Sequence, residues 1–254
     1  MEDKNALVLR RIPYGESDWI LSLFTEEGNK ISVFAAGARN SKKRFGSSLD
    51  LFNLVSVTFD HKPGRDLPLL NEAYLVEGFV ALRNDLTKFS AASFFGEMIS
   101  EFLPEKDPQH KLYQAFLGFL RTMESQAFLP DHFIPLMEHQ LLSHFGFQPR
   151  FTSCLICQEK LKASQSYYFH GAKGGVVCLA CHENTPVAHS VYLLDYVTIQ
   201  KMLSQLGRVP QDWPKESWGA DETLKMRKAL EYFIQFTVGK PLKSLNFLSQ
   251  ILLK

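Results

Sequence analysis

The stretch GARNSKKRFGSS, residues 37–48, separates two groups of strand-like runs near the N-terminus of the chain. Between Arg39 and Arg44 it carries four positive charges and no negative charge, and glycines flank these charges on both sides. Small barrels commonly hold a nucleic-acid backbone with a basic loop between strands. The stretch therefore predicts a β domain with a phosphate-binding loop. A solvated connection without a binding role is the alternative interpretation.

Short apolar runs lie on both sides of this stretch, at residues 7–12, 19–24, 31–34, 49–59 and 69–76. Residues 49–59 alternate apolar with other side chains, as a half-buried strand does. Turn signals separate the runs, including Pro63-Gly64 before the last one. Five strands with short connections predict a small closed barrel over residues 1–80, of either the OB-fold or the SH3-like type.

The charge of this region is close to balanced. Residues 1–80 contain ten Lys and Arg against eleven Asp and Glu, a net charge of −1, and the whole chain has a formal charge of +1. DNA binding would therefore depend on local clusters of positive charge. The candidate phosphate contacts are Arg39, Lys42, Lys43 and Arg44, followed by Arg10, Arg11, Lys30, Lys62 and Arg65.

From Leu82 onward the apolar residues recur at helical spacing, so residues 81–254 are predicted to be mainly helical. Pro104 ends the first helix, and Asp131 and Gly146 are the expected N-cap and C-cap of a third helix. Further helices are predicted at residues 112–128, 191–206, 224–238 and 241–253, with Asp221 or Thr223 as the N-cap of the helix at 224–238.

Positive residues cluster on the predicted helix that follows Asp221. They can bind an acidic peptide or a phosphate, and a solvated helix face is the alternative interpretation. The residues are Lys225, Arg227 and Lys228.

The four cysteines form two C-x-x-C pairs, Cys154 with Cys157 and Cys178 with Cys181, and twenty residues separate the pairs. The intervening residues 167–177 have the pattern of a hairpin, which would bring the second pair back to the first. Four thiolates suit a tetrahedral zinc ion and leave no open position for a substrate. The segment at 149–189 is therefore predicted to hold one structural Zn²⁺ per chain. Redox-active pairs and an iron–sulfur cluster are the alternatives.

No motif in the sequence predicts an enzyme. It has neither of the standard glycine motifs that cradle phosphates, and it has no G-x-S-x-G nucleophile motif. No apolar run approaches the roughly 18 residues that a membrane helix requires. We therefore expect a soluble, cytoplasmic, non-enzymatic protein without a membrane partner.

Two parts of the chain resemble the RecO family of bacterial recombination mediators. The first comprises RRIPYGESD at 10–18, TEEG at 25–28 and GARNSKKRFGSSLDLF at 37–52. The second comprises the paired C-x-x-C motifs and KPLKSL at 240–245. The resemblance implies an α+β multidomain fold, in which a five-stranded OB-fold barrel at 1–80 precedes a helical domain at 81–254. A zinc-binding segment would interrupt the helical domain at 149–189.

The resemblance also implies a function. Family members bind single- and double-stranded DNA, promote annealing, and help load RecA onto DNA coated by single-stranded-DNA-binding protein. The implied partners are RecR and the acidic C-terminal tail of single-stranded-DNA-binding protein, at the nucleoid of a bacterial cytoplasm. The alternative is a protein-interaction adaptor whose helical half binds an acidic peptide, with little DNA affinity of its own.

Overall fold

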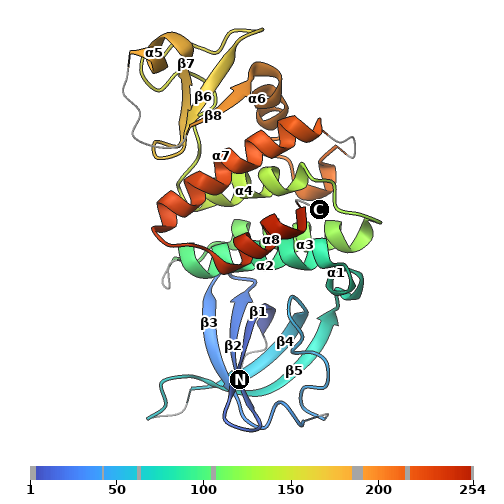
Figure 1. Ribbon diagram of the computed structural model, residues 1–254. Coiled ribbons are helices and arrows are strands. Elements are labelled where there is room, and N and C mark those ends of the chain that lie inside the picture. The colour runs from blue at the N-terminus through green and yellow to red at the C-terminus, as the bar shows by residue number, and fades with distance from the viewer. Residues whose placement is uncertain are drawn as a thin grey trace. The chain divides into compact units, whose positions relative to one another are not determined.

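The computed structural model describes residues 4–41, 43–61, 64–103, 107–184, 191–214 and 218–252. The chain divides into two compact units, Met1–Gln126 and Ala127–Leu253. The first contains strands β1–β5 and helices α1–α3, and the second contains the remaining elements (Figure 1). Helices α1–α3 therefore share a compact unit with the barrel. The sequence pattern had placed them in one helical domain with the later helices.

The N-terminal strands close into a barrel. They are β1 (Lys4–Tyr14), β2 (Asp18–Thr25), β3 (Lys30–Ala35), β4 (Leu54–Asp60) and β5 (Leu69–Glu77). The strand order is β1-β2-β3-β5-β4, with β1 pairing β4 to close the barrel and β3 running parallel to β5. This order is that of an OB-like barrel. The predicted five-stranded OB-type barrel is confirmed.

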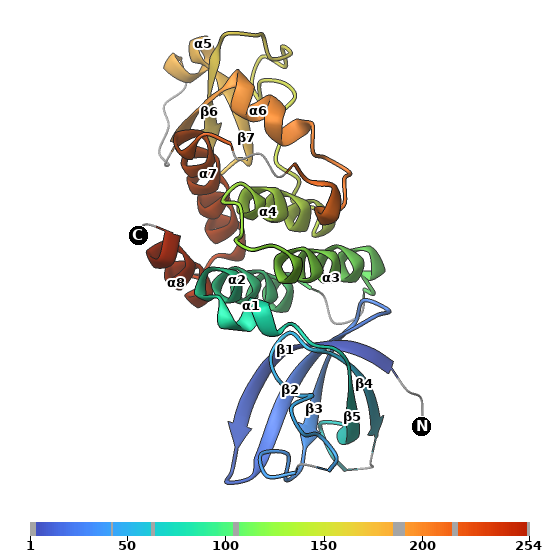
Figure 2. The same ribbon diagram turned by 90° about the vertical axis from the view of Figure 1, so that its right-hand side faces the viewer.

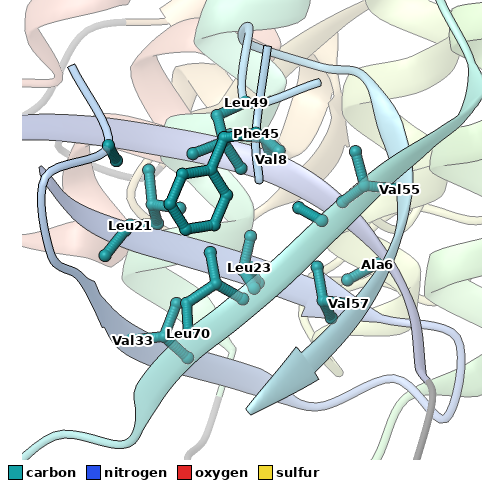
Figure 3. Packing of buried hydrophobic residues seen from close by; sticks show 13 residues of the cluster. Ala6, Val8, Leu21, Leu23, Val33, Phe45, Leu49, Val55, Val57 and Leu70 are labelled. Carbon is teal, nitrogen blue, oxygen red and sulfur yellow. The ribbon is translucent and has the colours of Figure 1, made fainter. Parts of the chain in front are cut away.

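The barrel core includes residues from the connection between β3 and β4, which we call the basic segment (residues 36–53). Figure 3 shows Phe45 and Leu49 of this segment among the inward-pointing side chains of the strands, such as Leu21 and Val33. Ala38 belongs to the same buried cluster. The basic segment therefore helps to close the barrel, because its apolar residues fill space that the strands leave open.

The prediction of a strand beginning at Leu49 was wrong, because β4 begins at Leu54. Phe52 has a φ of 68°, a left-handed conformation that an extended strand does not contain. Its N–H donates to the carbonyl of Val8 at 2.7 Å, and Val8 donates to the carbonyl of Asn53 at 3.1 Å. The apolar alternation at 49–53 thus reflects side chains that turn into the core and not an extended backbone.

Three helices complete the N-terminal unit: α1 (Val80–Asn84), α2 (Leu86–Phe102) and α3 (His110–Ser125). The carboxylate of Asp85 accepts a hydrogen bond from the N–H of Lys88 at 3.0 Å and so caps α2. Helix α2 ends at Phe102, as predicted, and Pro104 lies outside the described residues. Phe24 of β2 lies 5.5 Å from Tyr113 of α3 between ring centroids, so a helix covers this part of the outer face of the barrel.

The C-terminal unit combines helices with a small antiparallel sheet of order β7-β6-β8. Figure 2 shows β6 and β7 of this sheet with helix α6 beside them. The predicted hairpin is confirmed as β6 (Ser166–His170) and β7 (Gly175–Cys178). The predicted helix at 191–206 was wrong in its first part, because β8 (Val191–Asp195) pairs with β6 before α6 (Tyr196–Leu203) begins. The other elements are α4 (Phe133–His144), α5 (Leu179–Glu183), η1 (Pro210–Asp212), α7 (Ala220–Val238) and α8 (Lys243–Leu252).

The helix caps of this unit follow the sequence only in part. Gly146 has a φ of 82° after α4, and Phe147 donates to the carbonyl of Leu142 at 2.8 Å, which confirms the predicted glycine cap. Asp131 is not the N-cap of α4, since His132 occupies that position without a side-chain bond.

Helix α7 begins earlier than predicted. Gly219 is its N-cap, instead of Asp221 or Thr223, and the N–H of Gly219 donates to the carboxylate of Glu222 at 2.8 Å. Among the helices of the described residues, none combines the length and apolarity that a membrane span requires.

Candidate nucleic-acid interface and metal centre

Hydrogen bonds at the start and in the middle of the basic segment hold it against the barrel. The N–H of Gly37 donates to the carboxylate of Asp18 at 2.7 Å, and the N–H of Arg39 donates to the carbonyl of Ser17 at 2.9 Å. Further along, the N–H of Ala73 in β5 donates to the carbonyl of Arg44 at 3.2 Å. The segment predicted as a phosphate-binding loop is therefore tied to the β1–β2 turn and to β5.

The positive side chains of the basic segment have different surroundings. Arg39 and Lys43 are exposed. Arg44 is half-buried, with its guanidinium donating to the carbonyl of Ala36 at 2.5 Å and lying 4.8 Å from the ring centroid of Phe45. Lys42 lies outside the described residues. The structure thus leaves Arg39 and Lys43 available for a ligand, whereas Arg44 holds the segment itself.

The other predicted contacts on the barrel also divide into two kinds. Arg10 and Arg65 are exposed, and Lys62 lies outside the described residues. Arg11 forms an ion pair with Asp50 of the basic segment at 3.0 Å. The ammonium of Lys30 donates to the carbonyl of Ser100 in α2 at 2.5 Å. Arg11 and Lys30 therefore act first as internal contacts of the N-terminal unit.

Trp19 was not predicted as a site residue, yet two arginines meet at its ring. The guanidinium carbons of Arg11 and Arg39 lie 4.8 and 5.4 Å from the ring centroid. These are cation–π distances, and exposed contacts of this kind contribute about 0.5–1 kcal/mol. Trp19 thereby positions Arg39 beside the β1–β2 turn. The sequence showed a tryptophan at the start of a predicted strand, but it could not show that Arg11 and Arg39 meet at its ring, because both come from other parts of the fold.

The four cysteines converge, as the sequence predicted. Cys154 and Cys157 lie on the turn before β6, Cys178 ends β7, and Cys181 lies in α5. Their four sulfur atoms all lie within 4.8 Å of one another, and the Cys157 and Cys178 sulfurs are 3.9 Å apart. A tetrahedral ion with metal–sulfur bonds of about 2.3 Å places sulfurs about 3.8 Å apart. The group can therefore hold a metal ion.

The thiols show why a cation suits this group. Burial raises the pKa of Cys154, but backbone N–H groups, including those of Cys178 and Ile156 at 3.4 Å from its sulfur, lower it to about 6 overall. Hydrogen bonding to Cys178, then burial and the other thiols, raises the pKa of Cys181 to about 12. Four thiolates this close to one another repel electrostatically, and a divalent cation bound between them would offset that repulsion.

The positive cluster predicted on α7 is not one exposed group. Lys225 forms an ion pair with Asp221 at 2.5 Å, and this hydrogen bond raises the pKa of Lys225. Lys228 is exposed. Arg227 is only 7% exposed and pairs with Glu231 at 2.8 Å, so its prediction as a surface residue was wrong. Helix α7 packs against α4 on the side that carries Arg227.

A largely buried cluster of charged residues, which sequence reasoning missed, lies between α4 and α7. It consists of Glu138, Arg227 and Glu231. Glu138 is 0% exposed, and neither of its carboxylate oxygens has a hydrogen-bond partner among the described residues. Burial, then the charge of Glu231, raises the pKa of Glu138 well above its usual value, while Arg227 lowers it. Burial at this position therefore favours the neutral form of Glu138.

A cavity of about 280 Å³ lies near the start of α7. Trp218 and the buried His132 stack with ring centroids 5.6 Å apart at its wall, and the side chain of Phe128 at its rim is exposed. The other lining residues are Leu129, Pro130, Asp131, Ala220 and Thr223. Apolar and polar side chains both line this cavity, as in pockets that hold an apolar group and orient it with a few polar contacts.

Comparison with known proteins connects these features to a family. Residues 1–79 match the family model described as Recombination protein O N terminal, and residues 83–246 match Recombination protein O C terminal. The DNA repair protein RecO of Syntrophus aciditrophicus is 30% identical over 246 residues, which cover 96% of this chain and 93% of that protein. The DNA repair protein RecO of Myxococcus xanthus is 30% identical over 249 residues, with 98% and 97% covered. The chain therefore belongs to the RecO family.

Proposed function

We propose that this protein is a non-enzymatic recombination mediator that binds DNA during DNA repair. It binds single- and double-stranded DNA, promotes annealing, and with RecR helps load RecA onto DNA coated by single-stranded-DNA-binding protein. Membership of the RecO family supports the DNA-repair role. The observation that carries DNA binding is the pair of exposed cations, Arg39 and Lys43, on a basic segment fixed against an OB-like barrel.

In this proposal the exposed cations contact phosphates and so position the strand without reading its sequence. Arg39 is oriented by the ring of Trp19, and Arg10 and Arg65 extend the positive surface. Arg44 and Arg11 act indirectly, since they hold the segment on the barrel. Lys42 remains a leading candidate from the sequence, and Lys62 and Lys30 remain weaker ones.

The metal is proposed to be one zinc ion per chain with a structural role. Four thiolates are a donor set that soft ions such as zinc prefer, and they leave no position for a substrate. The residues that would hold the ion are Cys154, Cys157, Cys178 and Cys181. By linking the turn at 154–157 to the end of β7, the ion would fix the fold of the small sheet.

Changing Arg39 and Lys43 together to Ala is expected to weaken binding to single-stranded DNA and to reduce its salt dependence. Each lost phosphate contact removes about 0.7 from the slope of log affinity against log salt on a single strand, so two contacts remove about 1.4. Fluorescence anisotropy with a labelled oligonucleotide at several salt concentrations measures both quantities.

The matched control is Lys111→Ala, which removes an exposed charge from α3 in the same compact unit. This variant should retain the wild-type affinity and slope. Unchanged affinity and slope in the double variant would contradict the assignment of the basic segment. A wild-type protein without measurable DNA binding at low salt would contradict the proposed function as a whole.

The second candidate is an adaptor for an acidic peptide, and the cavity beside Trp218 and Phe128 favours it. An aromatic side chain of such a peptide would enter this cavity near the N-terminus of α7, whose dipole favours negative charge. Lys225 and Lys228 could add charge, whereas the buried Arg227 could not. Titration of a labelled acidic peptide in the same anisotropy experiment distinguishes the two candidates, because only an adaptor binds the peptide and not DNA.

A further inference from the structure

An aromatic pair lies on the barrel outside the basic segment. Tyr14 at the end of β1 and Phe34 of β3 have ring centroids 5.7 Å apart in an edge-to-face arrangement. Because β2 lies between β1 and β3, the two rings meet across β2. Ile20 of β2 pairs with Phe34 on one side and with Ile12 on the other. Together these four residues form what we call the aromatic platform.

The strand register places the platform on the outer face of the barrel. Leu21 and Val33 point into the barrel core, so their neighbours Ile20 and Phe34 point outward. A register shift between Val8 and Arg10 brings Arg10 opposite Ser22 and Ile12 opposite Ile20. An exposed arginine therefore shares the outer face with the platform.

The outer face is covered in one part and open in another. Phe24, further along β2, is fully buried and packs against Tyr113 of α3. Tyr14 is 55% exposed, and Phe34 and Ile20 are partly exposed. The platform thus presents aromatic and apolar surface that the described parts of the chain leave accessible.

Connections that carry positive residues border the platform. The β1–β2 turn, which follows Tyr14, accepts a hydrogen bond at Ser17 from Arg39 of the basic segment. The N–H of Phe34 donates to the carbonyl of Pro68 at 2.8 Å, at the end of the β4–β5 connection that contains the exposed Arg65. Exposed acidic residues, Glu16 and Asp66, lie in the same connections, so phosphate attraction there is partly opposed.

A ligand that matches this surface has flat apolar groups joined by a negatively charged backbone. Unpaired nucleobases have this chemistry, because every base offers a π-face that can stack on an aromatic ring. In a duplex the base faces are already stacked on each other and are not accessible to Tyr14.

We infer that the aromatic platform stacks unpaired bases on Tyr14 while the basic segment holds the phosphates of the same strand. This inference rests on the proposed DNA binding, and it adds a chemical reason for the barrel to prefer single strands over duplexes. Phe34 supports the Tyr14 ring edge-to-face and thereby keeps it in place over β2.

The test compares Tyr14→Ala and Tyr14→Phe on three probes: labelled oligothymidylate, an abasic strand with the same number of phosphates, and a duplex. Tyr14→Ala should weaken oligothymidylate binding about tenfold, which is about 1.4 kcal/mol and lies within the range for loss of one base stack. Binding to the abasic strand and the duplex should stay within about twofold of wild type, and Tyr14→Phe should retain oligothymidylate binding because it keeps the ring.

The matched control is Tyr74→Ala on β5, which removes an aromatic side chain that is 58% exposed and lies on another strand of the same barrel. It should leave all three affinities unchanged. The inference would be overturned if Tyr14→Ala weakened binding to the abasic strand as much as binding to oligothymidylate. It would also be overturned if wild type bound oligothymidylate and Tyr14→Ala bound it equally well. If wild type binds none of the probes, the proposed function itself has failed.

Discussion

A chain with Cys178 replaced by Ser is expected to be purified without bound metal and to lose the ordered structure around the cysteines. Wild type should contain one zinc per chain. Structural zinc contributes about 10–16 kcal/mol in isolated zinc-finger peptides, which is comparable to the whole stability of a typical domain. The loss should therefore lower the unfolding temperature of the C-terminal unit, to which all four cysteines belong.

Metal analysis by mass spectrometry measures zinc content, and limited proteolysis reports where the chain becomes accessible. New cleavage is expected in the turn that carries Cys154 and Cys157, since the metal would no longer join it to β7. Ser166→Ala, an exposed change in the neighbouring β6, is the control and should retain zinc. A metal-free wild type, or a Cys178→Ser chain with wild-type zinc and melting, would disprove the structural metal site.

Replacing Arg227 by Met is expected to destabilise the protein by about 3–5 kcal/mol, because it removes the ion-pair partner of Glu231 and the positive charge that opposes the burial of Glu138. Glu138 has no hydrogen-bond partner among the described residues, so the nearby charge of Arg227 is what offsets its burial. Urea unfolding at neutral pH measures the change in the free energy of unfolding. Lys228→Met, at the next position of α7 but exposed, should change it by less than about 0.5 kcal/mol.

The same cluster predicts a pH dependence whose sign follows from the raised pKa of Glu138. A carboxyl whose pKa is higher in the folded state than in the unfolded state contributes to the free energy of unfolding. That contribution is complete at pH values below the unfolded pKa, near 4.5. That contribution is lost as pH rises through the folded pKa. Glu138→Gln should therefore reduce the loss of stability between pH 4.5 and neutral or alkaline pH. An unchanged pH profile in Glu138→Gln would show that this carboxyl does not titrate across that range.

Local patterns predicted the elements whose contacts are local. The two C-x-x-C pairs and the hairpin between them were confirmed, because a hairpin needs only neighbouring residues to fold back. The barrel strands were recognisable from their short apolar runs and turns, as were most helices from their periodicity.

The errors arose where a distant partner decides the structure. Leu49 sits in the barrel core from a turn, and Val191–Asp195 is a strand because β6 pairs with it. Arg227 has the sequence context of a solvated helix residue, and only the packing of α4 shows that it is buried beside Glu138. Tyr14 and Phe34 likewise meet only after β2 is in place. None of these partners is close in sequence, so periodicity could not identify them.

The anchoring of the basic segment has a consequence for the thermodynamics of binding. A flexible loop loses conformational entropy when it closes on a ligand, and that loss subtracts from the affinity. Here Phe45 and Leu49 are already in the barrel core, and the backbone near Arg39 and Arg44 is already bonded to the β1–β2 turn and β5. The backbone that carries Arg39 and Lys43 is thus held against the barrel before a ligand binds. In the proposed DNA binding, few phosphate contacts would suffice for a chain with a net charge of only +1, because those contacts would require little ordering of the backbone.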